Sequence, residues 1–169
     1  MFIKNFKNVI KQKFNMKKII LLAIVLALAC STKKLNVSED KGIGDTRTKP
    51  VEFIDNNTYL LTEMSQDTTY GYDKSNPIKV GGVHDKDGPL NERRFLNALF
   101  GPNNKKMMYF RAGSCCAFKT PNGFINNMGM LDRFRVSEIG SKDTLNIYIN
   151  MYDAGDLKIP FGLKAQVKK

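Results

Sequence analysis

The chain has 169 residues, of which 27 are basic and 16 acidic, and its formal net charge is +11. Six lysines and no acids lie in residues 1–29, so the rest of the chain keeps 21 basic against 16 acidic residues, a net +5. These basic residues are scattered among acids and form no basic stripe, which argues against nucleic acid as a partner. The residues after position 29 suffice for one domain with its own core.

Residues 16–30, MKKIILLAIVLALAC, have the pattern of a secretory signal, with two lysines, eleven apolar residues and small residues before Cys30. The segment resembles a bacterial lipoprotein signal, in which the cysteine after the cut is lipidated and becomes the new N-terminus. Eleven apolar residues are too few to span a bilayer, which takes about 20. We therefore expect residues 1–29 to be a signal peptide, with Met16 an alternative start. Cys30 then carries a covalent lipid, and we expect no other cofactor.

Residues 31–49 are polar, with only isolated apolar side chains. Such a composition predicts a flexible tether, so we expect a lipidated N-terminus and tether over 30–49 and a single domain over 50–169. Two short strands are expected at the start of this domain, around Phe53 and over Tyr59–Met64, with a turn between them. A third short strand is expected at Ile78–Val80, ending at a pair of glycines.

A helix is predicted between Gly88-Pro89 and Gly101-Pro102, because proline suits the first helical position and glycine the position just past the end. Its apolar face contains Phe95, Leu96 and Leu99, and Glu92 is placed on its polar side. After it, Lys106–Ala112 predicts a strand and residues 121–130 a loop.

A hairpin with its turn over Gly140–Asp143 follows, in which apolar and polar residues alternate on both strands. On its second strand, four residues are expected to face the core: Leu145, Ile147, Ile149 and Met151. One helix among about six short strands predicts an α+β fold, a small antiparallel β-sheet domain with one main helix packed on it.

The opposite row of this last strand is a candidate binding face, because tyrosines and amides offer both ring surfaces and hydrogen bonds. It comprises Asn146, Tyr148, Asn150 and Tyr152. Four further residues join it if their strands are neighbours: Tyr70, Tyr72, Arg133 and Arg135. The alternative is a face that is covered by the helix or simply solvated.

Cys115 and Cys116 are adjacent, and Cα atoms of neighbouring residues lie closer than most disulfides prefer. The favoured interpretation is therefore two small buried side chains on opposite faces of a strand, and the alternative is a redox or metal role. His84, the only histidine, lies in VHDKDG, where a solvated turn is favoured over a metal site. No catalytic residue and no metal ligand set is predicted.

Four segments, YGYDKSNPIKVGG, GPLNERRFLNALFGP, GSCCAFKTPNG and LNIYINMYDAGDLKIPFG, resemble a family of small lipoproteins from Bacteroidetes-type bacteria. That family implies no particular activity. In such bacteria acidic residues after the lipidated cysteine favour the cell surface, and residues 31–34, STKK, are not acidic. The resemblance thus implies a lipid-anchored envelope protein, on the outer membrane and facing the periplasm.

The expected function is non-catalytic binding of an envelope protein or other envelope component through the sheet face, with the membrane contacted by the lipid anchor. The alternative is a small periplasmic enzyme or redox protein that uses Cys115 and Cys116 with His84. The two hypotheses differ in whether these three side chains meet in one site.

Overall fold

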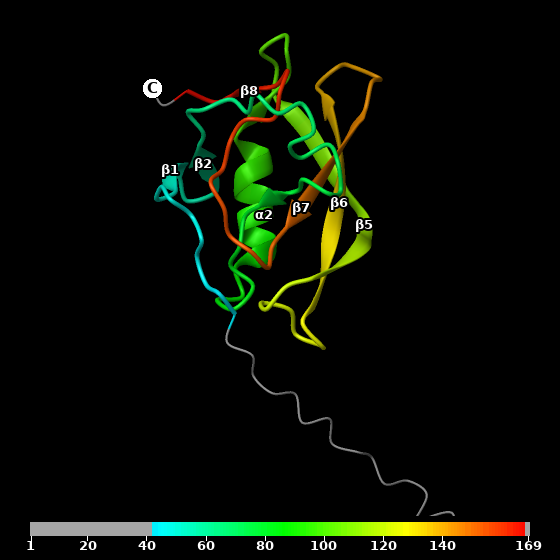
Figure 1. Ribbon diagram of the computed structural model, residues 1–169. Coiled ribbons are helices and arrows are strands. Elements are labelled where there is room, and N and C mark those ends of the chain that lie inside the picture. Colours follow the sequence, from blue (N-terminus) through cyan, green and yellow to red (C-terminus); the bar gives the residue numbers. More distant parts are fainter. Residues whose placement is uncertain (1–41, 168–169) are drawn as a thin grey trace, which may run out of the picture. The chain divides into compact units, whose positions relative to one another are not determined.

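The computed structural model describes residues 42–167 (Figure 1). The expected signal peptide over 1–29, Cys30 and most of the expected tether lie outside these residues. The elements, in chain order, are β1 (Glu52–Asp55), β2 (Thr58–Leu60), β3 (Ile78–Lys79), α2 (Gly88–Asn97), β4 (Leu99–Phe100), β5 (Met107–Lys119), β6 (Met128–Glu138), β7 (Leu145–Asn150) and β8 (Lys164–Ala165).

The main sheet has the strand order β3-β7-β6-β5. Strands β5, β6 and β7 are antiparallel, as the alternating hairpin pattern predicts, while β3 pairs with β7 in parallel. Two smaller pairs, β1 with β2 and β4 with β8, complete the described strands. The predicted α+β class is confirmed, and the main sheet is mixed because of β3.

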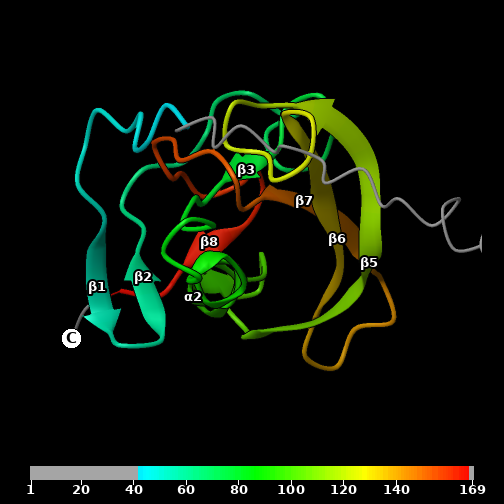
Figure 2. The same ribbon diagram turned by 90° about the horizontal axis from the view of Figure 1, so that it is seen from below.

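Helix α2 lies between the β1–β2 hairpin and the main sheet (Figure 2). Its Phe95 and Leu96 pack in one core cluster with Phe134 of β6 and Ile147 of β7. All four side chains are at least 96% buried, so this cluster holds the helix on one face of the sheet.

The helix ends at Asn97, before the predicted Gly101, because the chain leaves it to form β4. Leu99 pairs there with Ala165 of β8, and the Gln166 N–H donates to the Ala98 carbonyl at 2.8 Å. The pairing of β4 with β8 thus uses backbone N–H and C=O groups that would form intrahelical hydrogen bonds if the helix continued.

The β5–β6 hairpin is longer than its sequence pattern predicts. Strand β5 continues through Ser114, Cys115 and Cys116 to Lys119, and β6 begins at Met128, inside the expected loop. Two register shifts interrupt the pairing, one between Arg111 and Gly113 and the other between Cys115 and Ala117. A bulge adds one residue to a strand, so the side chains after it point to the opposite side from the one that strict alternation predicts. The sequence of β5 therefore lacks a regular alternation of apolar and polar residues.

The domain begins before Pro50. Asp45 forms a parallel bridge with Ala154. The Arg47 guanidinium donates to the carbonyls of Val80 and Gly155, and the Thr48 N–H donates to Asp156 at 2.9 Å. The segment over 45–49, expected to be tether, is therefore packed on the domain.

Candidate functional site

Four of the predicted face residues lie together on the side of the main sheet that points away from α2. In the register of β6 with β7, Arg133 is opposite Tyr148 and Arg135 is opposite Asn146. Opposed residues on neighbouring strands point to the same side. Phe134, between the two arginines, is buried in the core, so the four point to the other side, where both arginines are exposed.

Strand β5 adds an aromatic ring to this surface. Phe110 is opposite Arg135, and 59% of its area is exposed. We define the open face as Phe110, Arg133, Arg135, Asn146 and Tyr148. The sequence pattern does not place Phe110 on this surface, because the register of β5 against β6 depends on the two bulges.

Tyr70 and Tyr72 do not belong to the open face, and that prediction is wrong. They lie in a turn, not in an extended strand, and both pack against the core. The Tyr72 hydroxyl donates to the Phe161 carbonyl at 2.9 Å, and the Tyr70 hydroxyl accepts from the Lys158 N–H at 3.3 Å. Burial raises the pKa of each hydroxyl to about 12.

Asn150 and Tyr152 also leave the predicted row, because β7 ends at Asn150. Asn150 is only 1% exposed, and its amide donates to Asp153 Oδ2 at 2.8 Å. The Tyr152 ring is half-buried and packs edge-on against Phe118 and Phe124. Neither side chain therefore belongs to the exposed row that the strand pattern predicted.

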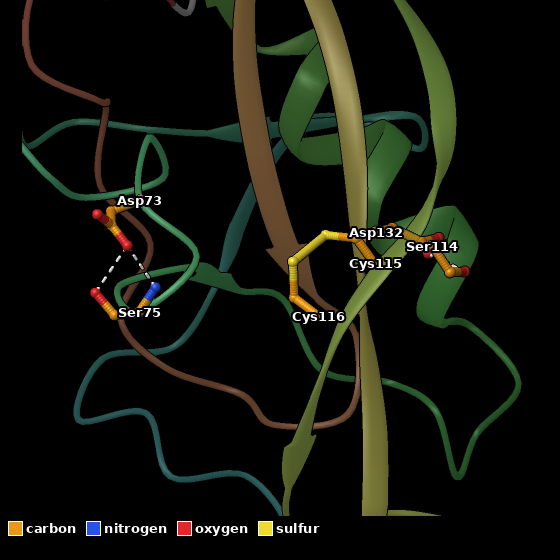
Figure 3. The surroundings of a disulfide bond; sticks show 6 residues. All are labelled: Asp73, Ser75, Ser114, Cys115, Cys116 and Asp132. Carbon is orange, nitrogen blue, oxygen red and sulfur yellow. Dashed lines mark hydrogen bonds between the residues drawn. A yellow bond between two sulfur atoms is a disulfide. The ribbon is translucent and has the colours of Figure 1, made fainter.

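Cys115 and Cys116 are joined by a disulfide and are half-buried. The favoured interpretation of two separate buried side chains is wrong. Cys116 takes a positive φ of 56° at the second bulge of β5, a conformation that non-glycine residues rarely adopt, and its side chain can thereby reach that of Cys115. In Figure 3 the bridge projects toward the loop of Asp73 and Ser75.

On the other side of β5, two acids, Asp132 and Glu92, lie beside Arg111 and Ser114, a group that was not predicted from the sequence. Arg111 binds Asp132 through two nitrogens, at 2.5 and 2.7 Å, and the Ser114 hydroxyl donates to the same carboxylate at 2.8 Å. Beneath them Glu92, predicted on the polar side of the helix, is only 2% exposed. Its Oε1 has no hydrogen-bond partner among the described residues.

Burial raises the pKa of Glu92 to about 8, and the neighbouring charge of Asp132 adds to the rise. Glu92 is therefore protonated at neutral pH and can donate to Asp132. The spacing of residues in the sequence already indicates that both acids are buried. Glu92 is three and four positions before Phe95 and Leu96, on the buried stripe of α2. Asp132 is in phase with the buried Phe134.

His84 makes an aromatic contact with the loop between β5 and β6. Its ring is exposed and meets Phe124 edge-on at 6.1 Å between centroids. Within residues 42–167, His84 makes its ring contact with Phe124, and the two cysteines bond to each other. No group of three histidine, cysteine or acidic side chains among these residues is arranged to hold a metal ion, so no metal site joins His84 to the two cysteines.

The described residues contain no group of three or more histidine, cysteine or acidic side chains arranged to hold a metal ion. Within the same residues, no helix has the length and apolar character needed to cross a bilayer. The chain matches no protein-family model, no curated protein and no solved structure.

Proposed function

We propose that this protein is a non-catalytic binding module of the bacterial cell envelope, anchored by lipid on Cys30, which binds an acidic segment of an envelope protein on its open face. The observation that carries the proposal is the cross-strand group of Phe110, Arg135 and Asn146 beside the pair of Arg133 and Tyr148. Five residues from three paired strands thus lie on one surface of the sheet.

The composition of the open face supports binding of a protein. Phenylalanine, tyrosine and arginine are enriched at protein interfaces, and tyrosine and arginine are frequent hot-spot residues. Phe110 exposes most of its ring beside Arg135, so an apolar contact and a cationic contact are offered together.

The charge of the open face supports an acidic partner. The ion pairs within residues 42–167 involve Arg47, Lys49, Arg94, Arg111 and Lys158, but neither arginine of the open face. Among the described residues Arg135 donates only to the Thr144 hydroxyl, at 2.8 Å. Two guanidinium groups without an ion-pair partner in this part of the chain attract carboxylates and speed association with a partner that carries them.

The envelope location rests on the sequence. The signal-like segment ends at Cys30, and the residues that follow it are not acidic, which favours the periplasmic side of the outer membrane. Two acyl chains or more are needed for a stable lipid anchor, and a lipidated N-terminal cysteine can carry them.

The test uses the lipidated full chain as bait in detergent-solubilised envelope. The variant Arg133→Glu/Arg135→Glu should lose the captured partner, and raising the salt concentration should release it from wild type. The control variant Lys74→Glu/Lys164→Glu makes the same charge change at two exposed positions off the open face. Equal capture by both variants would contradict the proposal.

A second candidate function is thiol–disulfide exchange, favoured by the half-exposed bridge between Cys115 and Cys116. In that reaction a partner protein with two thiols would give two electrons and two protons to the bridge, becoming a disulfide itself while Cys115 and Cys116 become thiols. His84 has no part in this candidate. Titration of the full chain with a dithiol redox buffer, read by alkylation and mass, tests whether the bridge exchanges reversibly.

A further inference from the structure

The loop that joins β5 to β6 exposes apolar side chains at one end of the domain. Phe124 and Ile125 are 56% and 63% exposed, and Met128 and Met130, at the start of β6, are 38% and 41% exposed. We call these four residues the apolar tip. In Figure 1 the loop lies at the same end of the domain as the start of the described chain.

The loop is held in shape by its own hydrogen bonds and by close packing. The Thr120 N–H donates to the Asn127 carbonyl at 2.8 Å, and the Gly123 N–H donates to the Thr120 carbonyl at 3.0 Å. A Cβ on Gly123 would lie 2.5 Å from the Met128 backbone, so only glycine fits there. The backbone thus fixes which side chains point outward.

The interior of the loop is already filled. Asn122 is 2% exposed, and its amide donates to Asp153 Oδ1 at 2.8 Å. The Phe124 ring packs edge-on against Tyr152 and His84, with 6.1 Å between centroids in each case. The exposed parts of Phe124 and Ile125 therefore stay in contact with solvent for as long as the loop keeps this fold.

The chain enters the domain at this same loop. A Cβ on Gly42 would lie 1.3 Å from Asn122 Oδ1 and 2.9 Å from His84 Nε2, which places Gly42 directly against the loop. Gly42 follows Cys30 by twelve residues. Twelve residues reach at most about 43 Å even when fully extended. A lipid on Cys30 would therefore hold this end of the domain near the bilayer.

The charge of the loop agrees with a membrane surface. The segment from Lys119 to Leu131 contains no acidic residue, and Lys119 is its one basic residue. Lys119 lies opposite Met128 in the register of β5 with β6. A lysine beside apolar side chains suits the boundary between anionic headgroups and acyl chains.

We propose that the apolar tip inserts into the headgroup region of the membrane that carries the lipid anchor. This inference rests on the anchor at Cys30 in the proposed function. The tip lies at one end of β5 and β6, so its insertion points these strands at the bilayer. The open face is then roughly perpendicular to the membrane surface, so a partner can bind it without contacting the bilayer.

The test exploits the absence of tryptophan from the chain, which allows one introduced tryptophan to report on its own position. Ile125→Trp places the reporter on the apolar tip, and Met128→Trp is a second reporter there. Phe110→Trp is the matched control, because Phe110 on the open face is 59% exposed against 63% for Ile125. Each lipidated full chain is reconstituted into vesicles of phosphatidylethanolamine and phosphatidylglycerol with brominated acyl chains.

The expected result is a blue shift and loss of emission for Ile125→Trp and Met128→Trp, with the emission of Phe110→Trp unchanged. Full emission from both tip reporters in protein that floats with the vesicles would overturn the inference. Equal quenching of Phe110→Trp would also overturn it, because the sheet would then lie flat on the membrane. Protein that fails to float at all overturns the lipid anchor, and flotation therefore separates failure of the proposed function from failure of this inference.

Discussion

Glu92 of α2 and Asp132 of β6 face each other beneath the exposed pair of Arg111 and Ser114. Glu92 is 2% and Asp132 4% exposed, so two carboxyl groups share a buried site that contains one ion-paired guanidinium. Burial disfavours the charged form of Glu92, and the negative charge of Asp132 disfavours it further, so both raise the pKa of Glu92. At a pKa of about 8 the protonated form of this buried side chain predominates at neutral pH.

This arrangement predicts a pH dependence of folding. The pKa of Glu92 is about 8 in the folded chain against 4.5 for an ordinary glutamate, so the folded state binds the extra proton. The contribution of Glu92 to the free energy of unfolding is therefore fully present below about pH 4.5 and is lost as the pH rises toward 8. Between these two values the free energy of unfolding should fall by about 1.4 kcal/mol for each pH unit. Chemical denaturation of the Glu92→Gln variant at a series of pH values should lack this slope.

Glu63→Gln is the control for that experiment. Glu63 is exposed, and its hydrogen bonds and ion pairs with Lys158 and Lys49 lower its pKa to about 2. Its contribution is present above the ordinary glutamate pKa and is lost only in acid, so this variant should keep the wild-type slope between pH 5 and 8. A Glu92→Gln variant with the same slope as wild type would contradict the neutral-acid interpretation.

Adjacent residues of β7 should respond oppositely to truncation. Ile147 has no exposed area, so Ile147→Ala should lower the free energy of unfolding by about 2–5 kcal/mol. Tyr148 is half-buried on the open face, and Tyr148→Ala should cost less stability but weaken capture of the partner. Denaturation and pull-down of both variants measure this, and equally severe unfolding of the two would mean that both faces of β7 are covered.

The segment before Pro50 should contribute to stability. Arg47 donates to the carbonyls of Val80 and Gly155, and only 13% of its side chain is exposed. Arg47→Ala leaves both acceptors without this donor and should cost about 1–3 kcal/mol. A chain that begins at Pro50 should melt at a lower temperature than one that begins at Ser31, and equal melting temperatures would show that the packing of residues 45–49 is unimportant.

The bridge between Cys115 and Cys116 should contribute little to the free energy of unfolding. It closes a loop of only two residues, for which the chain-entropy estimate is about 1 kcal/mol. The variant Cys115→Ser/Cys116→Ser should therefore fold and melt close to wild type. Alkylation before and after reduction, read by mass spectrometry, checks the bridge itself. Full alkylation without a reductant would contradict it.

Lipidation at Cys30 is a prediction of the sequence alone. Cys30→Ala should abolish incorporation of a labelled fatty acid and leave uncleaved precursor, because the thiol is the acceptor of the lipid. Metabolic labelling of the wild type and the variant is the measurement. Equal labelling of the two would show that the lipid is elsewhere or absent.

The sequence by itself determined the elements whose residues alternate or repeat without interruption. Phe134 and Val136 against Arg133 and Arg135 predicted a strand with one buried face, and Ile147 predicted its neighbour. The start of α2 at Gly88-Pro89 and the turn at Asn56–Asn57 follow from local chemistry of proline and asparagine. Such local rules hold because they depend on a few neighbouring residues.

Only the tertiary structure decided which faces and strand ends are covered. Leu145, in phase with Ile147, is 43% exposed because it lies at the end of its strand, while Asn150 is buried by hydrogen bonds to the turn that follows. Glu92 is buried because Arg111 and Asp132 come from strands that meet the helix only after folding. Periodicity assigns a side chain to one face of an element, but burial depends on which distant segment packs against that face.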